Sequence, residues 1–534
     1  MAEGKIFMQI RLQQIEGYAY GALQPSIIIR FSEIQTPSNE FKNQLKLIHS
    51  YIPNNECNDQ FLETTEIRRS ESFAKFFVAI IDAINYFCGD QRYTPITIFR
   101  ENGALCFALP TLSLNMIAFN INNLANFLSR SKLYISKKDT QKLITQLKSA
   151  TRPFLPSGTN AGNFLAAAAH HKIPFKIFNQ QYILFGYGSG SRIFNSSITD
   201  EESAIGVRLA KSKVDTNRLL KLSGIPVPEQ ARVNKINDAL NFADRVRYPV
   251  VLKPEHEEQG RGVFANISDR EELKIYLDQL QSRYKSILIE KHVDGDVYRM
   301  NTINGQFVRV VKRIGAQLVG NGYSTVSELL AELNNEPLRL DPHSSMNPIA
   351  LDDDVKRMLL KQSASVDTIL PEGKSIRLTS IASRGAHSID FIDSIHPDNR
   401  ALCEKVAAIM RLDVTGIDVI SADASKSWRE GNFWICEVNA QPQLGTVRTD
   451  IYETLLKSKI GEQPNIHINI TTNSKATALF DPQAQSLELE LTPDSVFQNG
   501  CPVQYFNTLE FSDDVPEFAK ERMKKILVSV KPDL

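Results

Sequence analysis

The stretch Pro249-Val250-Val251-Leu252-Lys253-Pro254 is followed by a loop, Glu255-His256-Glu257-Glu258-Gln259-Gly260-Arg261-Gly262-Val263, that contains two glycines. The apolar run predicts a buried strand that ends in a lysine. Glycines let backbone amides approach phosphate oxygens closely, and a lysine at the strand end can neutralise their charge. The loop lacks the G-x-x-x-x-G-K-[ST] arrangement and is therefore not a P-loop. Taken alone, the pattern is more often structural than functional.

Helices and strands alternate on both sides of this stretch, from about Ser203 to Ala440. Upstream, we expect one helix with apolar residues at Leu209, Leu219, Leu220 and Leu222 that carries Lys213 and ends at Gly224. Such alternation is typical of an α/β fold.

Downstream, Ser286-Ile287-Leu288-Ile289-Glu290-Lys291-His292-Val293 reads as a strand that runs into a polar hinge, and Asp294-Gly295-Asp296 follows it. Backbone groups of such a hinge can pair with the edge of an adenine ring, and a nearby carboxylate can take ribose hydroxyls. The histidine is more often packed than catalytic in this setting.

Carboxylates on apolar strands are the more informative signal. We expect strands at Gly416-Ile417-Asp418-Val419-Ile420 and Phe433-Trp434-Ile435-Cys436-Glu437-Val438-Asn439. A period of two puts Glu437 and Asn439 on one face and Trp434, Cys436 and Val438 on the other. If the strands are neighbours, Asp418, Glu437 and Asn439 present oxygen ligands to one point, which suits Mg²⁺ bound to nucleotide phosphates.

Cations complete the candidate set: Lys213, Arg299 after the hinge, and Lys312-Arg313 on an expected strand, Phe307 to Ile314. Phosphoryl transfer needs several positive groups around a spreading negative charge. Any one of these cations would by default be a solvated surface charge.

Composition limits the classes of partner. The chain has 534 residues, 61 Lys+Arg and 61 Asp+Glu, so its formal net charge is zero. We expect three or four domain-sized units, a small-molecule or peptide partner, and no nucleic-acid or membrane partner. The six scattered cysteines and the absence of a signal-peptide core or long apolar run lead us to expect a cytoplasmic protein. We also expect a homo-oligomer.

The order of these motifs resembles one family, cyanophycin synthetase, in its ATP-grasp domain. The resemblance covers roughly residues 154–445. The stretches that carry it are Thr216-Asn217-Arg218-Leu219-Leu220 after Lys213, Gly224-Ile225-Pro226-Val227-Pro228, Tyr248 to Pro254, Gln259-Gly260-Arg261-Gly262-Val263, Val319-Gly320-Asn321-Gly322, Ile395-His396-Pro397-Asp398-Asn399, Ser427-Trp428-Arg429-Glu430 and Glu437-Val438-Asn439-Ala440.

The resemblance implies ATP and Mg²⁺ as cofactors and a role for each matching residue. Nucleotide-binding positions are Lys213 and Lys253 on the phosphates, Gly260, Arg261 and Gly262 in the loop that covers them, Glu290, Lys291, His292 and Val293 in the adenine hinge, and Asp296. Catalytic positions that face the transferred phosphoryl group are Arg299 and Arg313. The metal ligands are Asp418, Glu437 and Asn439.

The chain departs from the family in its substrate loop. Where the family has Asn-x-Ser-Thr-Gly-Gly, this sequence has Ile381-Ala382-Ser383-Arg384-Gly385-Ala386, and Arg384 and Gly385 become the expected substrate-binding residues. Lys312 stands where the family has an acid, and Gln443 where it has a glycine. The resemblance therefore leaves the substrate open.

A second departure concerns the C-terminal region. Cyanophycin synthetase continues into a Mur-ligase-like module that opens with Gly-Thr-Asn-Gly-Lys-Thr-Thr, whereas Thr471-Thr472-Asn473-Ser474-Lys475-Ala476 lacks the glycines. About 90 residues are too few for that module. We expect either a vestige of it or a small α/β cap.

The sequence thus predicts an α/β protein with two ATP-grasp lobes that sandwich ATP. The expected parts are an N-terminal domain (1–150), an α/β linker unit (151–202), the ATP-grasp domain (203–445) and a C-terminal appendage (446–534). The expected function is an ATP-dependent carboxylate-amine ligase that forms an amide or peptide bond through an acyl phosphate. Two alternatives are a glutathione-synthetase-like ligase and a nucleotide-binding regulatory subunit without turnover.

Overall fold

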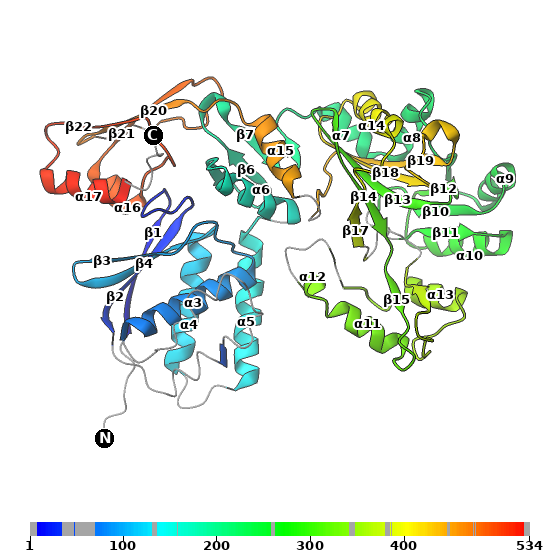
Figure 1. Ribbon diagram of the computed structural model, residues 1–534, viewed down its shortest axis with the longest axis horizontal. Coiled ribbons are helices and arrows are strands. Elements are labelled where there is room, and N and C mark those ends of the chain that lie inside the picture. The colour runs from blue at the N-terminus through cyan, green and yellow to red at the C-terminus, as the bar shows by residue number, and fades with distance from the viewer. Residues whose placement is uncertain are drawn as a thin grey trace. The chain divides into compact units, whose positions relative to one another are not determined.

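The computed structural model describes residues 8–34, 47–48, 70–130, 136–156, 158–257, 262–340, 346, 348–379, 385, 387–445, 449–473, 475 and 477–527. Internal contacts divide the chain into two compact units, Met1–Asn195 with Leu456–Leu534, and Ser196–Leu455 (Figure 1). The fourfold division expected from the sequence stays a prediction. Within the described ranges, we find no helix that combines the length and the apolar character needed to cross a membrane.

The first unit begins with an antiparallel sheet covered on one face by three helices. Alternation along its central strand explains the covering, because Ile27, Ile29 and Phe31 are buried against the helices while Ile28 points to the other face. The sheet order is β1 (Met8–Ile15), β2 (Ser26–Ile34), β4 (Ala104–Pro110), β3 (Thr97–Glu101), and the helices are α3 (Ser70–Cys88), α4 (Leu114–Arg130) and α5 (Lys137–Thr151).

The other face of this sheet shares a core with the C-terminal segment. Ile28 and Cys106 pack in one cluster with Ile466 and Ile468, and Tyr18 forms a backbone bridge with Cys501. The segment contains a parallel sheet of order β21 (Ser486–Leu491), β20 (Asn465–Ile470), β22 (Thr508–Phe511) and two helices, α16 (Pro493–Asn499) and α17 (Glu517–Leu527). The unit also contains η1 (Arg152–Phe154), α6 (Thr159–His170), β5 (Phe175–Ile177), β6 (Tyr182–Phe185), η2 (Gly188–Gly190) and β7 (Arg192–Asn195).

The second unit opens with two helices and a small antiparallel sheet. Both helices that follow its strands pack on one face, where Val250 and Leu252 are buried, so Lys253 points to the opposite face. The opening helices are α7 (Ala204–Lys211) and α8 (Lys213–Leu222). The sheet order is β11 (Phe264–Ile267), β10 (Val250–Pro254), β12 (Ile287–Lys291), β9 (Gln230–Val233), with helices α9 (Ile236–Val246) and α10 (Arg270–Gln281).

A five-stranded antiparallel sheet forms the rest of the candidate site's frame (Figure 1). Its order is β17 (His387–Asp390), β14 (Gln306–Ile314), β13 (Asp296–Ile303), β18 (Thr415–Ser421), β19 (Phe433–Asn439). Helix α14 (Pro397–Met410) and residues of α8 pack on one face, where Met300, Val310 and Ile417 are buried. The alternate residues of the same strands therefore point to the opposite face, which carries the polar groups described below.

A smaller satellite core lies beside these sheets in the same unit. It buries Ala316, Leu318 and Ile376 among the helices that follow. Its elements are β15 (Gln317–Val319), α11 (Val326–Asn334), α12 (Pro337–Leu340), α13 (Asp353–Lys361) and β16 (Ser375–Arg377). The remaining elements are β8 (Ile198–Thr199), η3 (Trp428–Glu430) and α15 (Asp450–Lys459).

The prediction of a single helix before Gly224 is wrong, because two helices meet at Ser212. Ser212 ends α7 and also caps α8, since its side chain accepts a hydrogen bond from the backbone N–H of Asp215. Serine at this position competes with the helical backbone for hydrogen bonds. Leu222, expected on the apolar face, is 78% exposed. The break places Lys213 in the first turn of α8.

Candidate active site

Neighbouring strands bring the predicted acidic residues together. In the register of the five-stranded sheet, Asp418 of β18 is opposite Arg299 of β13 on one side and Glu437 of β19 on the other. Asn439 is opposite Gly416, which precedes Asp418 by two residues on β18 and therefore lies on the same face. The expected pairing of the two carboxylate-bearing strands is confirmed.

Asp418 and Arg299 form a buried bidentate ion pair. Arg299 donates from Nε to Oδ1 at 2.6 Å and from Nη2 to Oδ2 at 2.8 Å. Burial opposes the charged forms, but Arg299 and Arg313 hold the pKa of Asp418 below its ordinary value. The same pairing raises the pKa of Arg299 despite its burial. Both groups are therefore charged at neutral pH.

Glu437 has weaker partners than Asp418. Its Oε1 lies 3.9 Å from Nζ of Lys213, beyond the range of a strong hydrogen bond. Burial and the neighbouring Asp418 raise the pKa of Glu437, although Lys213, Lys253 and Arg299 partly offset them. The Asn439 amide nitrogen lies 3.4 Å from Oδ2 of Asp418. Oxygen-bearing side chains of Asp418, Glu437 and Asn439 thus gather on one face.

A β-bulge at Cys436 corrects one part of the strand prediction. Asp418 is opposite Glu437, but the next residue, Val419, is opposite Ile435, so Cys436 is the extra residue. The buried side chains are therefore Phe433, Ile435 and Val438, whereas Trp434 and Cys436 do not share the face of Val438. Glu437 and Asn439 lie on one face, as expected, because the bulge precedes both of them.

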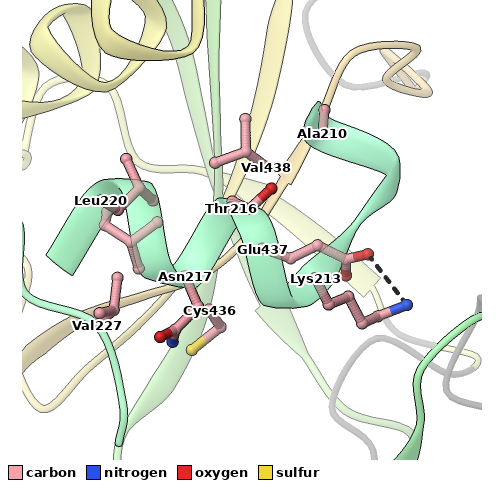
Figure 2. A pocket seen from close by; sticks show the side chains of 10 residues that line it. Ala210, Lys213, Thr216, Asn217, Leu220, Val227, Cys436, Glu437 and Val438 are labelled. Atoms are coloured by element: carbon pink, nitrogen blue, oxygen red, sulfur yellow. Dashed lines mark ion pairs between the residues drawn. The ribbon is translucent and has the colours of Figure 1, made fainter. Parts of the chain in front are cut away.

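Lys213 and Glu437 line a small pocket between α8 and β19 (Figure 2). Lys213 also donates from Nζ to the backbone carbonyl of Glu257 at 2.7 Å, which ties the loop after β10 to α8. The pocket is lined by Ala210, Lys213, Thr216, Asn217, Leu220, Val227, Ile435, Cys436, Glu437 and Val438. Its lining combines apolar side chains with four polar ones, Lys213, Thr216 and Asn217 of α8 and Glu437 of β19.

Lys253 is half-buried and pairs with Glu290 of the neighbouring strand, with Nζ and Oε1 2.5 Å apart. Burial alone would lower the pKa of Lys253, but the Glu290 carboxylate outweighs it and raises the pKa. Gln230 donates to the same carboxylate. Glu290 is therefore a partner of Lys253, a contact that the sequence did not predict.

The hinge side chains make local contacts. Lys291 donates from Nζ to the carbonyl of Arg247 at 2.9 Å, just after α9. His292 lies 3.2 Å from Asp294, and Asp296 pairs with Lys312 at 2.5 Å. Among the described contacts, these side chains do not join the cluster around Asp418. Nucleotide binding by Lys291, His292, Val293 and Asp296 stays a prediction.

Three predicted residues, Gly260, Arg261 and Arg384, lie outside the described residues. Gly262 has φ 69°, and a Cβ there would lie 2.9 Å from Cγ of Pro254, so a glycine is required. Gly385 accepts a hydrogen bond at its carbonyl from Nη2 of Arg339, at 3.1 Å. The substrate roles of Arg384 and Gly385 stay predictions.

Arg309 lies on the polar face of the five-stranded sheet, and the sequence did not single it out. It is 3% exposed and lies on β14, on the same face as Arg313. The signal was present, because positions 309, 311 and 313 alternate with buried Val310 on a predicted strand.

Comparison with known proteins first gives the class of domain: residues 206–315 match the family described as ATP-grasp domain. This match confirms the predicted ATP-grasp fold. The chain is 34% identical over 292 residues to cyanophycin synthetase from Synechocystis sp.. That alignment covers 53% of this chain and 33% of the other protein. It is also 30% identical over 258 residues to the bifunctional glutathione biosynthesis protein GshAB of Streptococcus mutans, covering 47% and 34%.

The chain thus spans about a third of the length of these curated relatives. Among solved structures, it is similar to a bifunctional glutathione synthetase from Pasteurella multocida, with a TM-score of 0.44 and 16% identity. That alignment covers 82% of this chain and 81% of the other. The similarity to cyanophycin synthetase expected from the motifs is confirmed.

Proposed function

We propose that this chain is an ATP- and Mg²⁺-dependent carboxylate-amine ligase that works through an acyl phosphate. The observation that carries the proposal is the gathering of Arg299, Arg313 and Lys213 around the carboxylates of Asp418 and Glu437. Phosphoryl transfer needs this combination of positive groups and hard oxygen ligands. The 34% identity to cyanophycin synthetase supports the same chemistry.

The side chains fit a divalent cation. Glu437 is a half-buried carboxylate beside Asp418, and among the described residues its ion pair is the 3.9 Å approach of Lys213 Nζ. Burial and Asp418 raise its pKa, and a bound cation would offset both effects. Asp418 and Asn439 lie on the same face and would complete an oxygen ligand set with it. When bound, Mg²⁺ supplies charge neutralisation of the nucleotide phosphates.

The protein groups have separable tasks in this scheme. Arg299 is fixed by its bidentate pair with Asp418, so it is preorganised toward the transferred phosphoryl group. Arg313 is held less tightly, with Nη1 3.9 Å from Asp418, and its pKa is lowered by burial and by Arg299. An anionic substrate therefore relieves a repulsion between these two arginines. Lys213 and Lys253 are the proposed contacts to the nucleotide phosphates.

The reaction would proceed in two balanced steps. A substrate carboxylate oxygen attacks the γ-phosphorus of ATP and ADP leaves, which gives an acyl phosphate. An amine then attacks the acyl carbon, phosphate leaves with the C–O electrons, and the amine proton passes to solvent or a base. In this scheme, buried Arg299 and half-buried Arg313 would face both charged transition states.

A glutathione-synthetase-type ligase is the second candidate, favoured by the 30% identity to the bifunctional glutathione biosynthesis protein. This second candidate would use the same acyl-phosphate chemistry as the first, with a different carboxylate and amine as substrates. Cytoplasmic location and a homo-oligomeric state are further parts of the proposal, and they rest on the sequence expectations. Sedimentation analysis of the purified chain tests the oligomeric state.

The test is phosphate release from ATP and Mg²⁺ with a panel of amino acids and short peptides, with products identified by mass. We expect phosphate release that depends on both a carboxylate and an amine. Lys253→Met should abolish it, because the lysine that faces the phosphates is lost. Lys274→Met is the control, since Lys274 is an exposed residue of α10 that pairs with Glu271. Carboxylate-independent phosphate release, or full activity of Lys253→Met, would contradict the proposal.

A further inference from the structure

Glu255 is a buried carboxylate in the loop that follows β10. It is 3% exposed and lies two residues after Lys253. In the sheet register, Arg232 of β9 is opposite Leu288 of β12, and Leu288 is opposite Lys253. Residues directly opposite one another point to the same face of a sheet, so Arg232 and Lys253 share the face away from the helices. The ion pair between Arg232 and Glu255 places this carboxylate on that face as well.

Arg232 and Ser286 hold the carboxylate of Glu255. Arg232 donates from Nε to Oε2 at 3.0 Å and from Nη2 to Oε1, and Ser286 donates from Oγ to Oε2. Burial disfavours the charged form, but these hydrogen bonds and the charge of Arg232 keep the pKa of Glu255 below its ordinary value. Glu255 is therefore ionised at neutral pH, and both of its carboxylate oxygens are fixed.

The backbone around Glu255 is fixed as well, and it in turn holds Lys213. The backbone N–H of Glu255 donates to the carbonyl of Ser286 at 3.1 Å, so the main chain and the side chain of Glu255 are both anchored on the residue before β12. Lys213 donates from Nζ to the carbonyl of Glu257 at 2.7 Å and to that of Glu255 at 3.4 Å. The anchored segment 255–257 thus determines where the ammonium group of Lys213 lies.

Glu437 competes with these carbonyls for Lys213, beside which it lies (Figure 2). Its Oε1 is 3.9 Å from Nζ, which is too far for a strong hydrogen bond. A displacement of the segment 255–257 would release the ammonium to close on Glu437, because an ion pair is stronger than a contact with a neutral carbonyl. Lys213 would then neutralise a proposed metal ligand and be drawn away from a phosphate.

We propose that Glu255 is a positioning residue for nucleotide binding that acts through Lys213. It fixes the segment whose carbonyls keep Lys213 apart from Glu437, so that the ammonium stays available to the nucleotide phosphates. This inference rests on the proposed function, in which Lys213 contacts those phosphates, and deepens it by adding a residue that does not touch them. A carboxylate near the phosphates would repel them, and the ion pair with Arg232 offsets that charge.

The dissociation constant of ADP in the presence of Mg²⁺, measured by calorimetry on the full chain, tests this role. Glu255→Gln keeps the shape of the side chain and removes its charge. We expect the dissociation constant to rise about tenfold, since hydrogen bonds to a charged group are lost. Asp244→Asn is the matched control, because exposed Asp244 of α9 pairs with Arg270 of α10 on the helices that cover the other face of the same sheet. It should change the dissociation constant by less than about twofold.

A double-mutant cycle with Lys213→Met separates the positioning role from general destabilisation. If Glu255 acts through Lys213, Glu255→Gln should raise the dissociation constant in the wild-type background and leave it unchanged in the Lys213→Met background. The same fold increase in both backgrounds would overturn the inference, because the effect would then not pass through the lysine.

Arg232→Gln is a second variant, and it leaves Glu255 in place. The side chain of Arg232 is 51% exposed, so its replacement creates no cavity in a core. We expect the dissociation constant of ADP to rise by about threefold or more. An unchanged dissociation constant in either variant would overturn the inference. Absence of ADP binding by the wild type would contradict the proposed function and the inference together, whereas carboxylate-independent phosphate release contradicts the ligase proposal alone.

Discussion

Asp418 and Glu437 are neighbouring carboxylates whose pKa values shift in opposite directions, downward for Asp418 and upward for Glu437. Asp418 is the ionic partner of buried Arg299, so its charge stabilises the fold. Glu437 is half-buried and lies beside another negative charge, and both burial and Asp418 raise its pKa, so its ionised form is less favoured than that of Asp418. Asp418 therefore stabilises the folded state in addition to its proposed role as a metal ligand, whereas the proposed role of Glu437 brings no such stabilisation.

Substitution should separate these effects. We expect Asp418→Asn to lower the free energy of unfolding by about 3 to 5 kcal/mol, because it leaves a buried arginine unpaired. Glu437→Gln should change stability by less than about 0.5 kcal/mol, since it removes an unfavourable charge. Both should abolish ligation. Urea unfolding measures the difference, and equal destabilisation by the two variants would contradict this account.

Asp90 gives a residue-scale test in the first unit, which does not contain the candidate site. It is fully buried, accepts hydrogen bonds from Thr111 Oγ1 and the backbone N–H of Leu112, and has its pKa raised to about 7 by burial and by Asp82. A raised folded-state pKa means that stability is highest below the ordinary value of 3.8 and is lost as pH rises toward 7.

The difference between the two pKa values corresponds to at most about 4 kcal/mol. We expect the melting temperature of the wild type, compared with that of Asp90→Asn, to fall between about pH 4 and pH 7. A melting-temperature difference that stays constant over this range would show that Asp90 does not titrate there.

At the scale of elements, β18 needs a glycine beside its carboxylate. A Cβ on Gly416 would lie 2.7 Å from Nη1 of Arg299 and 2.6 Å from Cβ of Pro442. The missing side chain leaves room for the arginine to lie flat against the strand and reach Asp418. The close approach here is a steric requirement of the ion pair.

We expect Gly416→Ala to destabilise the protein by about 1 to 3 kcal/mol and to lower kcat, because the alanine displaces Arg299. The control is Gly162→Ala in α6, where the nearest atom would be 3.7 Å from the new Cβ. That change should stabilise by about 0.5 to 1 kcal/mol. Thermal unfolding and phosphate release distinguish the variants; a fully active, fully stable Gly416→Ala would refute the steric argument.

Periodicity in the sequence predicted the strands of the site but not their irregularities. The apolar run before Lys253 and the pairing of the Asp418 and Glu437 strands agree with β10, β18 and β19. The bulge at Cys436 and the helix break at Ser212 were not predicted. Both depend on local hydrogen bonds and on neighbouring strands, which a regular repeat of apolar residues does not encode.

At the scale of the molecule, the first unit is built from both ends of the chain. Residues of β2 alternate between the helix-covered face and the face that packs on β20, where Ile466, Ile468 and Ile470 are buried. From the sequence we expected the C-terminal segment to be a separate appendage. Alternation shows that a strand has two apolar faces, but it does not show which distant segment covers the second face.

Removal of residues 461–534 should therefore expose one face of the N-terminal sheet. We expect the first unit of the truncated chain to lose its resistance to trypsin, while a fragment close to Ser196–Leu455 stays protected, because that unit has its own cores. Mass spectrometry of the digest identifies the fragment. Equal protease resistance of the truncated and full chains would show that the shared core contributes little.

The formation of an acyl phosphate is the central claim, and transfer of ¹⁸O tests it most directly. A substrate carboxylate labelled with ¹⁸O is incubated with ATP, Mg²⁺, an amine and the full chain, and the released phosphate is analysed by mass spectrometry. Attack of the carboxylate on the γ-phosphorus predicts one ¹⁸O atom in each phosphate per amide bond formed. Amide formation with unlabelled phosphate would contradict the account.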